Sequence, residues 1–216
     1  MRADQPGHIV VEGPIGVGKT SLARRLAESL GVELLLESAD ANPFLERFYE
    51  DPRQAALPTQ LYFLFQRARQ IQALRQGDMF RQGRVADFLF EKDRVFAHLT
   101  LDDDELQLYE QVHERLAVAA PPPDLVIYLQ APVEVLLRRI AARGVPHERL
   151  IEAAYLQRLC DAYADFFYHY AAAPLLIVNA TEIDTVNNDA DYELLLERIR
   201  ATRSGRHYFN PVPIAL

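Results

Sequence analysis

Short apolar runs alternate along the chain with longer segments of helical periodicity. Five apolar runs predict strands over residues 9–12, 33–37, 84–87, 125–129 and 175–178, with helices between them. Alternation of this kind is typical of a parallel sheet that is covered by helices on both faces. Continuous runs such as 125–129 suit strands that are buried on both sides. We therefore expect a three-layer α/β fold with a five-stranded parallel sheet.

Other polar and apolar positions mark where helices begin and end. The prolines at 121–123 end one helix before the strand at 125–129, and Pro132 starts the next helix. The acidic run at 102–105 could hold a metal ion. We favour an N-terminal cap for a helix reaching Ala120, because acidic side chains complement the helix dipole. Residues 204–216 predict an irregular tail. The length suits a single domain over 1–216.

A glycine-rich loop follows the first predicted strand and precedes a helix. The loop reads Gly13, Pro14, Ile15, Gly16, Val17, Gly18, Lys19, Thr20, and Ser21 begins the helix. This matches G-x-x-x-x-G-K-[ST], in which backbone N–H groups and the lysine bind phosphates and the hydroxyl ligates Mg²⁺. A glycine-rich turn without nucleotide is the alternative. The strand-and-helix setting favours a P-loop that binds ATP with Mg²⁺.

Composition narrows the classes of partner. The formal net charge is −8, which argues against a nucleic-acid groove, since binding a phosphate backbone needs a basic face. The single cysteine, Cys160, excludes an internal disulfide and is expected in the core. Residues 1–8 lack an apolar signal core, and no apolar run approaches the ~20 residues of a membrane span. We expect a cytoplasmic protein without a membrane anchor.

Two carboxylates end neighbouring predicted strands. Glu37 closes the second strand and Asp87 the third, and ligands in open parallel sheets bind beyond the carboxyl ends of strands. Phosphoryl transfer needs a group that takes the acceptor's proton, which Glu37 could be. Asp87 could join Thr20 in a Mg²⁺ site. The alternative for Glu37 is a solvated strand-end carboxylate. Asp87 could also be a helix N-cap, which is compatible with a role in the Mg²⁺ site.

A predicted helix over 59–74 carries polar residues on one stripe. Gln60, Phe63 and Arg67 share a face, so a planar ring could stack on Phe63 and be hydrogen-bonded at its edge. The simpler interpretation is that Gln60 and Arg67 are solvent-exposed residues at the edge of an amphipathic helix. After the fourth strand, Arg139 and Arg143 could form a lid over the phosphates at about 139–150. They could instead be ordinary basic residues at a helix C-terminus, where a positive charge interacts favourably with the helix dipole.

The order and spacing of these residues resemble the deoxyribonucleoside kinases, in particular the bacterial deoxyadenosine/deoxyguanosine kinase-like members. The likeness covers nearly the whole chain, through residues 13–20, Glu37, 49–52, 56–60, 87–94 and 137–144. It implies a P-loop α/β kinase, usually a homodimer, that transfers the ATP γ-phosphate to the 5′-hydroxyl of a deoxynucleoside in nucleotide salvage.

The resemblance also implies roles for individual residues. Glu37 is similar to the general base, Tyr49 to the residue that meets the sugar 3′-hydroxyl, and Gln60 to the base-edge amide. Arg67 and Asp93 resemble a pair that reads the far edge of the base and accompanies purine or cytosine substrates. Phe96 and Glu148 complete the implied substrate set, and Lys19, Arg139 and Arg143 the implied catalytic cations.

The chain departs from the family pattern in two places. Phe88 and Leu89 follow Asp87 where many members have Arg-Ser, so an arginine near the acceptor is missing. Many members also read Arg-Gly-Arg in the lid, whereas here Val145 follows Gly144. Either Arg138 or Arg149 substitutes for that lid arginine, or the lid is weaker.

Two other functions share some of these motifs. A nucleoside monophosphate kinase of the thymidylate kinase type needs a cationic acceptor site, for which Arg47, Arg53 or Arg94 could be recruited. Glu37 argues against it, because a carboxylate repels an acceptor phosphate. A non-catalytic nucleotide switch that reads guanine would show an N-K-x-D-type motif, which the chain lacks.

Overall fold

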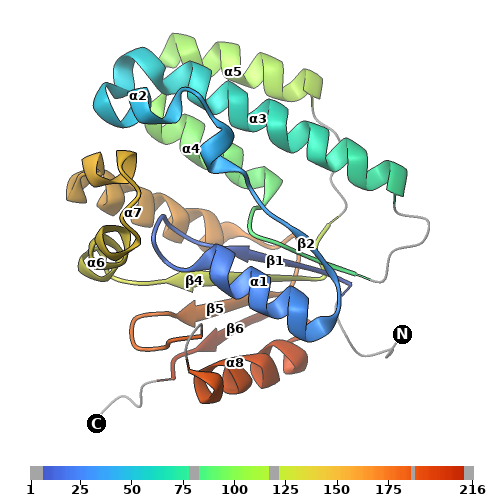
Figure 1. Ribbon diagram of the computed structural model, residues 1–216. Helices are drawn as coiled ribbons and strands as arrows, with labels where there is room; N and C mark the ends of the chain where they lie inside the picture. Colours follow the sequence, from blue (N-terminus) through green and yellow to red (C-terminus); the bar gives the residue numbers. More distant parts are fainter. Residues whose placement is uncertain (1–6, 78–82, 117–121, 186–187, 212–216) are drawn as a thin grey trace.

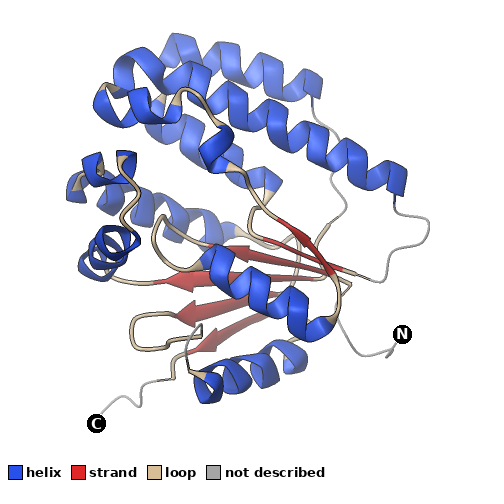
Figure 2. Cartoon of the chain, in the orientation of Figure 1, coloured by secondary structure: helices blue, strands red, loops and turns tan. Residues whose placement is uncertain are grey.

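Six parallel strands form a single sheet in the computed structural model, which describes residues 7–77, 83–116, 122–185 and 188–211. The strand order is β2-β3-β1-β4-β5-β6, and every neighbouring pair is parallel. The strands are β1 His8–Glu12, β2 Glu33–Leu35, β3 Arg84–Ala86, β4 Leu125–Gln130, β5 Leu175–Asn179 and β6 Arg206–Phe209. The expected α/β fold with a parallel sheet is confirmed (Figure 2).

Helices connect the strands and cover the sheet. They are α1 Lys19–Leu30, η1 Ala39–Ala41, α2 Leu45–Glu50, α3 Pro52–Gly77, η3 Phe90–Lys92, α4 Asp93–Thr100, α5 Asp103–Leu116, α6 Val133–Arg143, η4 His147–Leu150, α7 Ala153–His169 and α8 Asp189–Ala201. In Figure 1, α1 lies in front of the strands and α7 behind them, while α2 to α5 gather beside the β2–β3 edge. No helix in these described ranges is long and apolar enough to cross a membrane.

The main core lies between the sheet and its covering helices. Val10 and Ile127, from β1 and β4, are almost completely buried, as expected for strands covered on both faces. Tyr128 of β4 stacks on Phe167 of α7 with ring centroids 4.2 Å apart. Cys160 is half-buried against this core rather than fully inside it, and its thiol is free.

A separate apolar cluster holds α3, α4 and α5 together. It is built on Leu64, Ile71, Ala97 and Tyr109. A second small cluster joins α2 to the start of α3. These helices pack on one another, α4 also packs on α7, and together they lie on one side of the strand carboxyl ends (Figure 1).

The structure corrects several expectations about the elements. The sheet has six strands rather than five, because residues 206–209 of the expected irregular tail form β6. Arg206 anchors this edge strand by donating to the carbonyls of Phe167 and Tyr168, at 3.0 and 2.8 Å. The long helix starts at Pro52, well before residue 59, with Pro58 inside its first turns. Residue 120, the expected end of another helix, lies outside the described residues.

Candidate active site

The P-loop joins β1 to α1 and its glycines are required by its path. Gly13 and Gly16 have φ of +149° and +82°, a region that side chains rarely adopt. A Cβ at Gly13 would lie 2.4 Å from the Leu129 carbonyl oxygen. Lys19 Nζ donates to the carbonyls of Gly13 and Pro14, at 2.8 and 3.2 Å. Gly13 and Pro14 therefore hold the lysine.

Burial and then the positive charge of Lys92 lower the pKa of Lys19 to about 8. An ammonium that is destabilised in this way gains from a nearby anion. The loop thus fits a polyphosphate on physical grounds, because it offers a cation whose charged form is incompletely compensated.

A cavity of about 450 Å³ opens between the P-loop, α6 and the segment after β5. Its lining includes Gly16, Val17, Gly18 and Ser21 from the loop and helix, Arg139 and Arg143 from α6, and residues 180–185 after β5. Arg139 donates to the carbonyls of Val17 and Ala180, at 3.3 and 2.7 Å. Burial, followed by the charge of Arg138, lowers the pKa of Arg139. We refer to this cavity as the donor cavity.

A second cavity, of about 150 Å³, lies on the other side of Lys19 and Gly16. We refer to it as the acceptor cavity. Thirteen residues expected in the site line it: Ile15, Gly16, Lys19, Thr20, Glu37, Tyr49, Gln60, Phe63, Arg67, Asp87, Phe96, Arg143 and Glu148. They come from the P-loop, two strand ends, α2, α3, α4 and the segment after β4, so tertiary packing unites patterns spread over much of the sequence.

Glu37 lines this acceptor cavity. Arg67 Nη2 is paired with its Oε1, and Lys92 Nζ lies 3.5 Å from its Oε2. Burial raises the pKa of Glu37, but the positive charges of Arg67, Lys92 and Lys19 outweigh burial and hold it at about 2. The carboxylate is therefore ionised and only 15 % exposed, unlike a solvated strand-end acid.

Asp87 joins the P-loop to the Glu37 segment. Its Oδ2 accepts a hydrogen bond from Thr20 Oγ1 at 2.6 Å, and its Oδ1 accepts from the Glu37 N–H at 2.7 Å. Asp87 precedes no helix directly, so the N-cap interpretation is wrong. A hydroxyl and a carboxylate oxygen at the phosphate edge are ligands that suit Mg²⁺.

The polar stripe of α3 faces the acceptor cavity, not solvent. Gln60 and Arg67 are 5 % and 3 % exposed, so they are not solvent-exposed residues at the edge of an amphipathic helix. Arg67 Nη1 is paired with Asp93, and its guanidinium lies 5.3 Å from the Phe63 ring centroid. Among the described residues, Arg67 Nε and Asp93 Oδ2 have no hydrogen-bond partner although both are buried. A donor and an acceptor thus remain available beside the ring platform.

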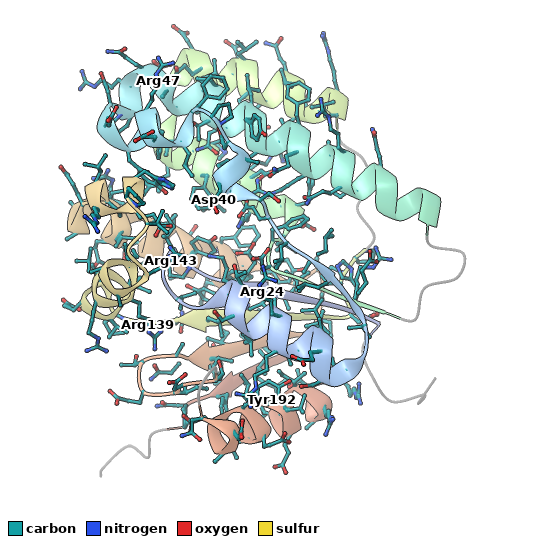
Figure 3. All side chains as sticks on the ribbon, in the orientation of Figure 1. Arg24, Asp40, Arg47, Arg139, Arg143 and Tyr192 are labelled. Atoms are coloured by element: carbon teal, nitrogen blue, oxygen red, sulfur yellow. The ribbon has the colours of Figure 1, made fainter. Side chains whose placement is uncertain are left out.

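The segment after α6 closes one wall of the acceptor cavity. Arg143 Nε donates to Glu148 Oε2 at 2.9 Å. His147 stacks on Tyr49, with ring centroids 6.0 Å apart and planes 9° from parallel. Figure 3 shows Arg139 and Arg143 beside the strand carboxyl ends, near the P-loop. Arg138 and Arg149, the possible substitutes for the missing lid arginine, are both exposed.

Sequence reasoning missed Glu12, Lys92 and His147. Glu12 is completely buried at the end of β1, and Lys92 is 1 % exposed. Glu12 gives a usable signal, since it is a charged residue in an apolar strand directly before the P-loop. Lys92 gives none, because it lies in the charged run 91–94, which reads as a solvated surface.

The fold and site together define a P-loop phosphotransferase, with a donor cavity and an acceptor cavity that share Gly16 and Arg143 in their linings. The family model described as "Deoxynucleoside kinase" matches residues 9–203. The chain belongs to the deoxynucleoside kinase family, and it is an ATP-dependent phosphotransferase.

Relatives and solved structures agree with this assignment. The chain is 31% identical over 198 residues to the deoxyguanosine kinase of Bacillus subtilis, covering 89% of this chain and 95% of that protein. It is 30% identical over 199 residues to the deoxyadenosine/deoxycytidine kinase of the same organism, covering 88% and 90%. The structure of deoxyadenosine kinase from M. mycoides with bound dATP superposes with a TM-score of 0.76 at 25% identity, covering 89% and 98%.

Proposed function

We propose that this enzyme transfers the γ-phosphate of ATP to the 5′-hydroxyl of a purine deoxynucleoside or of deoxycytidine. The observation that carries this proposal is the place of Glu37, an ionised carboxylate between Arg67 and Lys92 in a cavity that also reaches Lys19 and Gly16. A hydroxyl acceptor needs a carboxylate beside it, whereas an acceptor phosphate would be repelled.

Each residue then has a defined task. Glu37 accepts a hydrogen bond from the 5′-hydroxyl and takes its proton as transfer proceeds. Tyr49 and Glu148 face the sugar, Phe63 and Phe96 pack against the base, and Gln60, Arg67 and Asp93 bond its edge. Lys19, Arg139 and Arg143 stabilise the negative charge on the transferring phosphoryl group.

Thr20 and Asp87 would hold Mg²⁺ at the phosphate edge. The ion, when bound, neutralises charge on the β- and γ-phosphates. The Thr20 hydroxyl and the Asp87 carboxylate already lie 2.6 Å apart, so the two oxygens can share one cation with little rearrangement.

The arrangement of cations disfavours phosphorylation of a monophosphate. Arg67 and Lys92 line the acceptor cavity, but both are paired with carboxylates. Arg47 and Arg53 are exposed, with Arg47 at the outer side of α2 (Figure 3), and Arg94 pairs with Glu110 at 2.7 Å. None of these three arginines lines the cavity.

The test is transfer from γ-labelled ATP to each of the four deoxynucleosides and to each deoxynucleoside monophosphate. We expect labelled 5′-monophosphates from deoxyadenosine, deoxyguanosine or deoxycytidine, and no labelled diphosphates. Efficient labelling of a monophosphate acceptor would overturn the proposal. A matched reaction with 5′-deoxy analogues should give no product, because the accepting hydroxyl is absent.

We also propose a cytoplasmic homodimer, as the family resemblance implies. The free thiol of Cys160 suits a reducing compartment. Light scattering of the purified enzyme should give twice the 24.6 kDa mass of the chain. A mass that stays at the single-chain value over a broad concentration range would contradict the dimer.

A further inference from the structure

A lysine that sequence reasoning passed over lies between two buried carboxylates. Lys92 ends η3, and its Nζ lies 3.1 Å from Glu12 Oε1 and 3.5 Å from Glu37 Oε2. Lysines are almost never fully buried unless they are paired. Lys92 also lines the acceptor cavity, with its Nζ 5.7 Å from the Phe96 ring centroid. Its charge therefore acts inside the site.

Glu12 is a rigid anchor for this lysine. Its Oε1 accepts the Leu89 N–H at 2.7 Å, and its Oε2 accepts the Gly13 N–H at 3.0 Å and the Tyr163 hydroxyl at 3.1 Å. These bonds tie it to the P-loop, to the segment after β3 and to α7. Glu12 is thus hydrogen-bonded at both oxygens without Lys92, which can serve a second carboxylate.

That second carboxylate is Glu37, whose two oxygens face different cations. Arg67 is paired with Oε1, and Lys92 approaches Oε2. The backbone of Glu37 is fixed separately by the bond from its N–H to Asp87. One cation at each oxygen restrains rotation of the carboxylate plane, and a proton acceptor must be held in a narrow range of orientations.

We propose that Lys92 is a positioning residue for Glu37. Anchored on Glu12, it holds the Oε2 side of the carboxylate while Arg67 holds Oε1, so that Glu37 meets the 5′-hydroxyl in a fixed orientation. Phe88 and Leu89 directly follow Asp87 and carry no charge. The cation comes instead from the next turn, η3. This inference rests on the proposed function, because it assumes that Glu37 takes the acceptor's proton.

A double-mutant cycle between Lys92 and Glu37 tests the inference. Lys92→Gln keeps a hydrogen-bond donor for Glu12 but removes the charge. With Glu37 present, we expect kcat to fall by about tenfold or more, with KM for ATP and deoxynucleoside within about twofold. With Glu37→Gln already in place, Lys92→Gln should lower kcat by less than about twofold, because its effect passes through Glu37.

Two outcomes overturn the inference. One is an equal loss of kcat in both backgrounds, which means that Lys92 only stabilises the fold around Glu12. The other is a loss confined to KM. Thermal unfolding and calorimetric binding of deoxynucleoside without ATP report the fold independently of turnover. Should Lys92→Gln not fold, Glu12→Gln/Lys92→Met, which removes both charges of the pair, enters the same cycle.

Matched variants complete the design. Lys92→Arg keeps the charge and should retain more kcat than Lys92→Gln. Arg94→Gln removes a cation two positions later on α4 that pairs with Glu110 instead, and it should leave kcat within about twofold. If the wild type transfers phosphate to no deoxynucleoside, the proposed function fails and the inference with it. Transfer with additive losses overturns the inference alone.

Discussion

At the scale of single residues, the site is a cluster of oppositely charged side chains. They are largely shielded from solvent and compensate one another's charge. Glu37 stays ionised because Arg67 and Lys92 outweigh the cost of its burial. A carboxylate whose pKa is about 2 is a weak base. It therefore takes the proton late, as the transferring phosphoryl group bonds to the acceptor oxygen and the hydroxyl becomes acidic.

Replacement of Glu37 by Gln tests this role. The amide keeps the size and can still hydrogen-bond, but it cannot take a proton, so kcat should fall by ~10²–10⁴-fold with deoxynucleoside affinity little changed. Because the pKa lies at about 2, wild-type kcat should show no acid limb from Glu37 between about pH 5 and 8. Equal losses of affinity and kcat would indicate a structural carboxylate instead.

The lowered pKa of Lys19 predicts that nucleotide binding is coupled to proton uptake. A pKa of about 8 means that most of the free enzyme carries a neutral Lys19 above that pH. Bound phosphates favour the ammonium and raise this pKa, so ATP binding at about pH 9 should take up close to one proton. ATP affinity should consequently weaken as the pH rises through 8, whereas uptake at about pH 6.5 should be near zero.

Calorimetry in two buffers of different ionisation enthalpy measures this uptake. Lys19→Arg is the matched control, because a guanidinium stays charged over the whole range and should bind ATP without taking up a proton. Uptake in Lys19→Arg equal to that of the wild type would assign the proton to another group.

At the scale of elements, local patterns were predictable and tertiary ones were not. The P-loop could be read from sequence because strand, glycines and lysine are contiguous. β6 could not, because it has only four residues without a continuous apolar run, and its pairing depends on β5 and on Arg206 reaching α7. The buried contacts of Lys92 likewise depend on residues far away in the chain, which no local period reveals.

The acidic run before α5 is a local pattern whose role could be predicted from the sequence. Asp102 Oδ1 accepts the Glu105 N–H at 2.9 Å, and Glu105 Oε2 accepts the Asp102 N–H at 3.3 Å. This reciprocal pair is a capping box, as a local reading of the sequence favours. Among the described residues, no cluster of three or more histidines, cysteines or acidic side chains is placed to hold a metal ion.

Asp102→Ala should therefore destabilise the protein without affecting catalysis. Loss of an N-cap typically costs ~0.5–2 kcal/mol, which corresponds to a fall in Tm of a few degrees for a domain of this size. Asp102→Asn, which keeps a capping oxygen, should lose less. Thermal unfolding with and without Mg²⁺ is the measurement. A rise in Tm with Mg²⁺ that the wild type shows and Asp102→Ala loses would restore the metal-site interpretation.

At the scale of the whole molecule, Arg67 connects base recognition to proton transfer. It lies on α3, and its guanidinium pairs with Glu37 after β2 and with Asp93 on α4. Removing Arg67 would therefore disturb specificity and kcat together. A clean test of base recognition must change Asp93, which pairs with Arg67 through Oδ1 and whose Oδ2 has no partner among the described residues.

Substrate choice provides that test. The buried Asp93 Oδ2 and Arg67 Nε lack partners among the described residues, and a site built for a polar edge rejects an analogue that leaves such groups unpaired. Wild type should thus prefer deoxyadenosine, deoxyguanosine or deoxycytidine to thymidine by orders of magnitude in kcat/KM. Asp93→Asn keeps the shape and leaves Arg67 on Glu37, so it should narrow that gap mainly by weakening the preferred substrates. The base-reading assignment fails if wild type prefers thymidine, or if Asp93→Asn lowers all four values by one common factor, since a common factor would mean that Asp93 only supports Arg67 against Glu37.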